Sequence, residues 1–148
     1  MDDMSSRRRR GFGAERELVR KLWRMGFAAI RAPASGAKVK KSVYPDVVAI
    51  YRGKVLVFEV KSRKKLCTIY IPHRQLVRLE EFARRAGGEA YIAIKLGDLK
   101  TWKVVALSSI ICEGDRCRIP KDVIENSKDL SQLLAEVLGC DLTKYMKR

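Results

Sequence analysis

Hydrophobic residues recur along this chain with two different periods, and the alternation between these periods predicts the secondary structure. Leu18, Val19 and Leu22 are spaced as on one face of a helix, whereas residues 44–51 and 54–61 are rich in β-branched and aromatic side chains, as strands are. By these criteria we expect helices over residues 14–25, 72–86 and 130–138, and strands over residues 27–30, 44–51, 54–61, 68–71, 90–95 and 102–107. This order indicates an α/β fold with a mixed β-sheet flanked by α-helices.

Glycine and proline residues mark the expected ends of these helices. Gly26, the pair Gly87–Gly88 and Gly139 follow the three helical patterns, and Pro72 suits the first turn of the second helix. Each helix therefore has a predicted boundary as well as a predicted apolar face.

Two basic segments show neither period. Residues 1–10 contain an arginine run and no apolar pattern, so we expect a flexible basic arm followed by a single domain over residues 11–148. Residues 32–42 contain Pro33, Gly36 and three lysines, which predicts a flexible basic loop.

The positive charge of the chain is concentrated in its first two-thirds. The net charge is +15, and residues 1–103 contain 25 lysines and arginines against 10 aspartates and glutamates, whereas residues 104–148 contain 7 of each kind. A localised basic field of this kind is typical of proteins that bind a polyanion, above all nucleic acid. An anionic membrane surface is the lesser alternative, because no amphipathic basic helix carries aromatic anchors.

Sequence patterns argue against a membrane span and against a zinc site. No apolar stretch approaches the ~20 residues that cross a bilayer, and no apolar segment follows the arginine run, so we expect a cytoplasmic protein. The cysteines form no CxxC pair, and His73 has no second ligand at metal-site spacing. Cys112 and Cys117 could form a disulfide, although we expect free buried thiols instead.

Two carboxylates meet on the predicted hairpin of residues 44–61. If the turn is centred between Arg52 and Gly53, Asp46 and Glu59 are cross-strand partners on one face of the sheet. Lys61 lies two residues beyond Glu59 and therefore projects from the same face. An acidic side chain in the otherwise apolar run 55–60 is costly unless it is paired or binds a metal ion.

A divalent cation would relieve the repulsion between these two carboxylates. Mg²⁺ prefers oxygen ligands and keeps several waters, so it suits a carboxylate pair beside an open coordination site, where it would supply a Lewis acid for phosphodiester hydrolysis. Lys61 would orient or deprotonate the attacking water, or stabilise the charge of the transition state. The pattern Pro45-Asp46 followed by Glu59-Val60-Lys61 is thus the PD…(D/E)xK arrangement of metal-dependent nucleases.

Glu15 is a candidate third acid. It shares a helix face with Leu18, Val19 and Leu22, where a carboxylate without a function is poorly placed, although acids are also favoured in the first turn of a helix. Glu17 is expected instead to pair with basic residues of its own helix at positions 20 and 21.

Several short motifs between residues 7 and 107 occur in a characteristic order. They are Arg10-Gly11, Glu15-Arg16-Glu17-Leu18-Val19, Gly26-Phe27, Arg31-Ala32-Pro33-Ala34-Ser35-Gly36, Pro45-Asp46, Glu59-Val60-Lys61 and the segment 82–88. In this order they resemble the archaeal Holliday junction resolvases of the Hjc type.

The resemblance implies a restriction-endonuclease-like fold and a homodimer that nicks four-way DNA junctions with Mg²⁺ or Mn²⁺. It places metal ligands at Glu15, Asp46 and Glu59 and the catalytic lysine at Lys61. It also implies phosphate contacts from Arg16 and Arg31, a catalytic contribution from Ser35, and a dimer contact at Phe82.

Recognition of a four-way junction should depend on phosphate contacts and DNA shape more than on base edges. The expected contributors are the basic residues of the arm, the loop and the turn after the hairpin: Arg10, Lys38, Lys40, Lys41, Arg63 and Lys64. Other recombination or replication proteins are possible partners that the sequence does not specify.

Two alternatives remain open at the level of sequence. One is another nuclease of the same fold, such as a repair or restriction enzyme or a closely related type of resolvase, which comparing the cleavage of junction and duplex DNA in Mg²⁺ would distinguish. The other is a non-enzymatic DNA-binding or architectural protein, in which replacing Asp46 would leave function intact.

Overall fold

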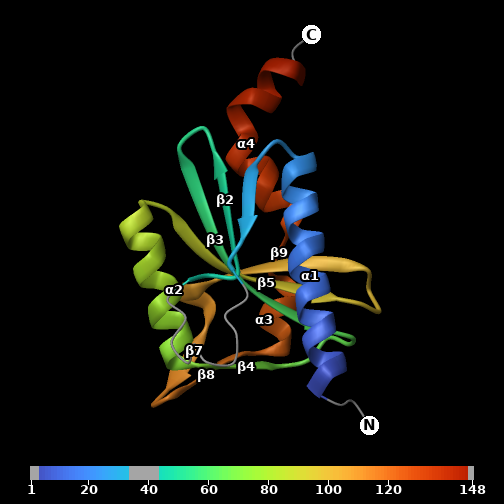
Figure 1. Ribbon diagram of the computed structural model, residues 1–148, viewed down its shortest axis with the longest axis vertical. Coiled ribbons are helices and arrows are strands. Elements are labelled where there is room, and N and C mark those ends of the chain that lie inside the picture. Colours follow the sequence, from blue (N-terminus) through green and yellow to red (C-terminus); the bar gives the residue numbers. More distant parts are fainter. Residues whose placement is uncertain (1–3, 34–43, 147–148) are drawn as a thin grey trace.

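The computed structural model describes the backbone of residues 4–33 and 44–146 and the side chains of residues 13–33 and 44–139 (Figure 1). Its centre is a six-stranded sheet in the order β1-β2-β3-β5-β6-β9. The strands are β1 (Ala28–Arg31), β2 (Val47–Tyr51), β3 (Lys54–Arg63), β5 (Glu89–Leu96), β6 (Thr101–Ala106) and β9 (Lys128–Asp129). Only β3 and β5 are paired in parallel, so the sheet is mixed, as predicted.

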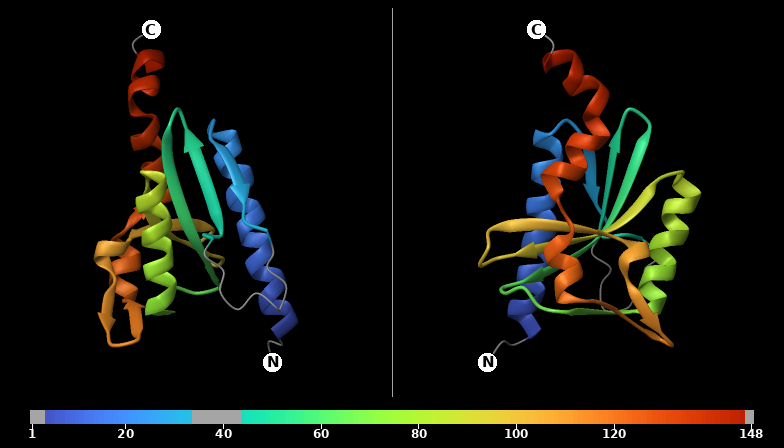
Figure 2. Two further views of the ribbon diagram at one scale, coloured as in Figure 1. Left: turned by 60° about the vertical axis from the view of Figure 1, so that its left-hand side comes forward. Right: turned by 180° about the vertical axis from the view of Figure 1, so that it is seen from behind.

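Helices cover both faces of this sheet (Figures 1 and 2), and a hydrophobic layer lies between each face and its helices. Helices α1 (Met4–Arg24) and α4 (Leu130–Met146) pack on one face, where β3 contributes Leu56 and Phe58. Helices α2 (His73–Ala86) and α3 (Lys121–Asn126) pack on the other face, where β3 contributes Val57. Because β3 is covered on both sides, its apolar run is nearly continuous rather than alternating.

A second, three-stranded antiparallel sheet completes the layer that contains α2. It consists of β4 (Ile69–Pro72), β8 (Arg116–Ile119) and β7 (Ile111–Glu113), which follows the short 3₁₀ helix η1 (Leu107–Ser109). The sequence patterns predicted β4 but neither β7 nor β8, because residues 111–119 include four charged side chains and lack the run of β-branched and aromatic residues that marks a strand.

Both terminal helices are longer than predicted. Helix α1 begins at Met4 instead of near Ala14, so residues 4–10, which we expected to form an arm without regular structure, continue the helix. Arginine is a good helix former, and a search for apolar periodicity does not detect such a segment. Helix α4 runs through Gly139 to Met146, although we expected Gly139 to end it.

Gly87 and Gly88 end α2 as predicted. Gly87 adopts a left-handed conformation with φ of 68°, and its N–H donates to the carbonyl oxygen of Arg84. A Cβ atom at Gly88 would lie 2.3 Å from the carbonyl oxygen of Val55, so this turn packs directly against β3. No helix in the described part of the chain is both long enough and apolar enough to cross a membrane.

Cys112 and Cys117 form a disulfide, contrary to the expectation of free thiols. They are cross-strand partners of the β7–β8 hairpin, with their Cα atoms 4.0 Å apart. The pairing of two strands that sequence periodicity did not detect brings the two thiols together. Cys67 is a free, half-buried cysteine.

We expect Cys112→Ser to reduce the free energy of unfolding by about 2 kcal/mol, because the disulfide restricts the unfolded chain. The loss is at the low end for a disulfide, since the loop that it closes contains only a few residues. Urea unfolding under oxidising conditions measures this loss, and a reducing agent should lower the stability of the wild type by a similar amount. Cys67→Ser is the matched control, with an expected change below about 1 kcal/mol. Equal stability of Cys112→Ser and the oxidised wild type would contradict the prediction.

Candidate active site

The β2–β3 hairpin has the register that the sequence predicted. Its paired residues run from Val47 opposite Phe58 to Tyr51 opposite Lys54, so the turn is centred between Arg52 and Gly53. The same register, extended by one residue, would place Asp46 opposite Glu59.

At Asp46 the regular ladder changes. The N–H of Asp46 donates to the carbonyl oxygen of Phe58 at 3.0 Å, and the Asp46 Oδ2 atom accepts the N–H of Val60 at 2.8 Å. The side chain of Asp46 thus takes the place of a backbone partner for β3. Pro45 precedes it and has no N–H to continue the pairing.

The carboxyl groups of Asp46 and Glu59 are hydrogen-bonded to each other. Burial is the main cause that raises the pKa of both groups, and for Glu59 the charge of Asp46 raises the pKa further, to about 8. The N–H of Val60 and the charge of Lys61 oppose this rise at Asp46. The pair therefore retains a proton at neutral pH, with Glu59 as its carrier.

Lys61 lies on the same side of β3 as Glu59. Its Nζ atom is 3.7 Å from the Glu59 Oε1 atom and donates a hydrogen bond of 3.5 Å to the Gln75 Oε1 atom. The Lys61 side chain is 20% exposed and that of Glu59 is 18% exposed, so both reach solvent from a largely buried position.

Glu15 of α1 approaches the carboxyl pair from a neighbouring element. Burial and the negative charge of Asp46 raise the pKa of Glu15 to about 7, against the lowering effect of Arg31 and Arg16. The Arg31 Nε atom lies 3.9 Å from the Glu15 Oε2 atom, and Arg31 ends β1. The structure thus brings Glu15, Arg16 and Arg31 to the site that contains Asp46, Glu59 and Lys61.

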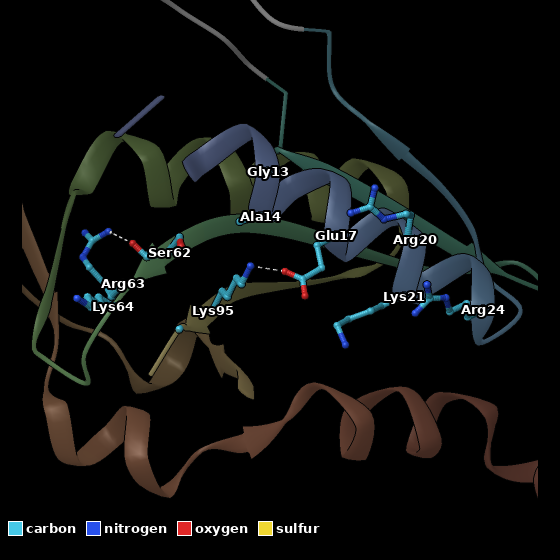
Figure 3. Close-up of a pocket in the computed structure, with 11 residues that line it drawn as sticks. Gly13, Ala14, Glu17, Arg20, Lys21, Arg24, Ser62, Arg63, Lys64 and Lys95 are labelled. Carbon is cyan, nitrogen blue, oxygen red and sulfur yellow. Dashed lines mark hydrogen bonds and ion pairs between the residues drawn. The ribbon is translucent and has the colours of Figure 1, made fainter. Parts of the chain in front are cut away.

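The other candidate residues lie away from this site or outside the part of the chain that the structure describes. Arg63 and Lys64 line a separate basic cleft (Figure 3). The side chain of Arg10 is outside the described residues, and so are the loop residues Ser35, Lys38, Lys40 and Lys41. The expectation for Glu17 was wrong: its carboxylate pairs with Lys95 of β5 rather than with residues 20 and 21 of its own helix.

The donor set at this site fits Mg²⁺. Two adjacent carboxyl groups, which would repel each other once both are ionised, provide the hard oxygen ligands that Mg²⁺ takes, and this ion needs only one or two carboxylates. Within the described residues, no three acidic, histidine or cysteine side chains are already arranged as a metal cluster. Glu15 would therefore join Asp46 and Glu59 only after its side chain moves, or through water.

Gln75 is a site residue that the sequence patterns did not single out. It lies in the first turns of α2, and its spacing from Leu79 and Ala83 places it on the apolar stripe of that helix. A polar residue on this stripe is the same signal that identified Glu15. Its side-chain oxygen accepts the hydrogen bond from Lys61, a contact that would orient the lysine side chain.

We expect Gln75→Ala to lower the rate of phosphodiester cleavage by roughly tenfold while DNA affinity stays within about twofold, because Lys61 loses the hydrogen-bond acceptor that α2 provides. Single-turnover kinetics with a parallel binding measurement would test this. Glu80→Ala, which removes an exposed side chain from the same helix, is the control. An unchanged rate for Gln75→Ala would show that Lys61 needs no such partner.

Solved structures share this architecture. The chain is similar to the Holliday junction resolvase Hjc of the hyperthermophile Archaeoglobus fulgidus, with a TM-score of 0.71 and 31% identity over 84% of this chain and 95% of that one. The bacterial homing endonuclease I-Ssp6803I shares the fold alone, with a TM-score of 0.50 and 15% identity over 98% of this chain and 99% of that one. Fold and site together define a protein of the restriction-endonuclease-like class.

A family model described as archaeal Holliday junction resolvase (Hjc) matches residues 6–139, and the chain belongs to that family. Crossover junction endodeoxyribonuclease Hjc of Sulfolobus acidocaldarius is 45% identical over 135 residues, and that of Sulfurisphaera tokodaii is 40% identical over 135 residues. Each alignment covers 90% of this chain and 92% of the relative. The family and the fold predicted from the sequence are confirmed.

Proposed function

We propose that this protein is a structure-specific endonuclease that resolves four-way DNA junctions by Mg²⁺-dependent hydrolysis of phosphodiester bonds. The observation that carries the proposal is the buried, hydrogen-bonded pair of Asp46 and Glu59 with Lys61 3.7 Å from Glu59. Membership of the resolvase family supports the junction as substrate, since relatives with 40–45% identity are named crossover junction endodeoxyribonucleases.

In this proposal Asp46 and Glu59 hold the metal ion. When bound, Mg²⁺, or Mn²⁺ in its place, would supply Lewis-acid activation of the scissile phosphate and of the attacking water. The shared proton of the pair must leave before both carboxylates can act as ligands. Glu15 completes the acidic set from α1, and Arg31 balances its charge at 3.9 Å.

Lys61 contributes a positive charge beside the reacting phosphate. Gln75 accepts a hydrogen bond from its Nζ atom, which limits the directions in which the ammonium group can point. Lys61 would then stabilise the negative charge that develops in the transition state, or orient the attacking water. Arg16 and Arg31 would hold the flanking phosphates through charge-assisted hydrogen bonds.

We further propose a homodimer that makes paired nicks. Resolution requires two cuts related by symmetry, and a C2 dimer presents two identical sites. Phe82 of α2 is a candidate anchor, because it is only partly buried against its own core. Sedimentation of the protein with and without junction DNA measures the assembly directly.

Cleavage of a four-way junction, compared with a linear duplex of the same sequence, tests the proposed function. We expect nicking of the junction in Mg²⁺ and none in EDTA, with the duplex cut at least about tenfold more slowly. Equal rates on both substrates would support a general nuclease of the same fold. No cleavage of either substrate in Mg²⁺ or Mn²⁺, with binding intact, would favour a non-enzymatic DNA-binding protein.

A further inference from the structure

A basic cleft lies between α1 and the ends of β3 and β5, outside the candidate active site (Figure 3). Its volume is about 600 Å³. Six cationic side chains and one carboxylate line it: Arg20, Lys21, Arg24, Arg63, Lys64, Lys95 and Glu17. Figure 3 shows the side chains of α1 on one side of the cleft and those from β3 and β5 on the other.

The cleft and the active site use different faces of α1. Glu15 shares its face with the buried residues Leu18 and Leu22, whereas Lys21 lies about 120° and Arg24 about 180° around the helix from Glu15 by the helical period. None of the acidic site residues, nor Lys61, lines the cleft. The basic cleft is therefore a separate site on the surface and not a part of the candidate active site.

Most of the positive charge in this cleft is uncompensated. Lys95 forms an ion pair with Glu17, with Nζ and Oε2 2.5 Å apart. Among the residues that the structure describes, the other five cations of the cleft form no ion pair with a carboxylate. Like charges gathered around one concavity repel each other, so an anionic ligand would be bound favourably there.

The lining indicates the backbone of a nucleic acid rather than its bases. The remaining lining residues are Gly13, Ala14, Ser62 and Gly97, so no aromatic ring is available for stacking on a base. A neighbouring cavity of about 370 Å³ shares Lys21 and Arg24 and adds Lys100, together with the carboxylate of Asp129, the buried Trp102 and other uncharged residues. A basic surface that extends along a helix suits a row of phosphates better than a single small anion.

We propose that this cleft binds the sugar-phosphate backbone of one junction arm, away from the scissile phosphate and without reading base sequence. The inference rests on the proposed function in one respect, since it takes the polyanion to be junction DNA. Arg63 and Lys64, which the sequence identified as DNA-binding, act in this cleft together with the basic face of α1. Glu17 weakens the attraction between the cleft and the DNA backbone, because its carboxylate neutralises the charge of Lys95.

Opposite charge changes in the cleft provide the test. Binding of the full-length protein to a four-way junction is measured in EDTA, where no cleavage occurs, over a series of salt concentrations. The variants are Lys21→Gln with Arg24→Gln, Glu17→Gln, and Lys121→Gln as control. Lys121 is an exposed residue at the start of α3 that lines neither cavity, so its replacement changes net charge alone.

For the double variant we expect about tenfold weaker binding. The slope of the logarithm of the binding constant against the logarithm of the salt concentration should also be smaller in magnitude by about 2, since each phosphate contact contributes about 0.9 to it. Glu17→Gln should bind about twofold to threefold more tightly, and damage to the fold cannot produce that sign. Lys121→Gln should change affinity by less than about twofold.

The proposal is overturned if the double variant loses no more affinity than Lys121→Gln, or if Glu17→Gln binds more weakly than wild type. Thermal unfolding of each variant identifies any that fails to fold, and Glu17→Gln then decides the outcome. Failure of the proposed function is visible separately, because it concerns cleavage by the wild type in Mg²⁺ and leaves these binding measurements unaffected.

Discussion

Asp46→Asn is expected to reduce the rate of junction nicking by roughly a thousandfold or more and to leave junction affinity within about threefold. Asparagine retains a side-chain oxygen that can accept the hydrogen bond from the N–H of Val60, which is 2.8 Å long in the wild type. The end of the β2–β3 hairpin should therefore keep its geometry. It loses the negative charge that the metal ion requires. Single-turnover cleavage and binding in EDTA measure the two effects separately.

The control for this substitution is Asp122→Asn, which makes the same chemical change at an exposed position in the first turn of α3. Its nicking rate should stay within about twofold of wild type. If Asp46→Asn retained more than a tenth of the wild-type rate with Mg²⁺ at saturation, Asp46 would not be a metal ligand. The non-enzymatic alternative predicts no cleavage by any of the three proteins.

The central part of the site could be predicted because it depends on local geometry. A two-residue turn at Arg52-Gly53 fixes the register of the hairpin, and the strand period then fixes which face carries Glu59 and Lys61. Sequence reasoning identified Glu15 by its position on the apolar face of α1, and its carboxyl group does lie near Asp46.

The parts that were missed depend on contacts between distant segments. Glu17 pairs with Lys95, and Lys61 contacts Gln75, and neither pairing follows from the period of a single element. Predicting the disulfide between Cys112 and Cys117 required the β7–β8 pairing, and the charged residues of this hairpin hide its strand pattern. The departure of Asp46 from the ladder also had no signal beyond the preceding Pro45.

Burial of the acidic site has a consequence for folding as well as for catalysis. Glu59 lies on a strand whose neighbours Phe58 and Val60 are buried, and its side chain is only 18% exposed. Keeping it ionised beside Asp46 costs free energy in the absence of a cation. The structure tolerates the pair at neutral pH because one proton is shared, so metal binding and stability should be linked through that proton.

We therefore expect the metal-free protein to lose a few kcal/mol of stability between pH 5 and pH 9. The pKa of Glu59 is raised from 4.5 to about 8 and that of Glu15 from 4.5 to about 7. Between the unfolded and folded pKa values the native state binds more protons than the unfolded state, so stability falls as pH rises. The contribution is fully present below about pH 4.5 and is lost as pH rises through 7 to 8.

Chemical unfolding in EDTA at several pH values, for the wild type and Glu59→Gln, isolates this effect because other titrating groups are common to both proteins. The variant should show a flatter dependence, and its advantage over the wild type should grow as pH rises from about 4.5 to about 8 and then level off. Adding Mg²⁺ at pH 8.5 should restore stability to the wild type and have little effect on Glu59→Gln, since the ion binds the deprotonated pair. Parallel pH profiles for the two proteins would show that Glu59 carries no retained proton, and an equal response to Mg²⁺ would place the metal ion elsewhere.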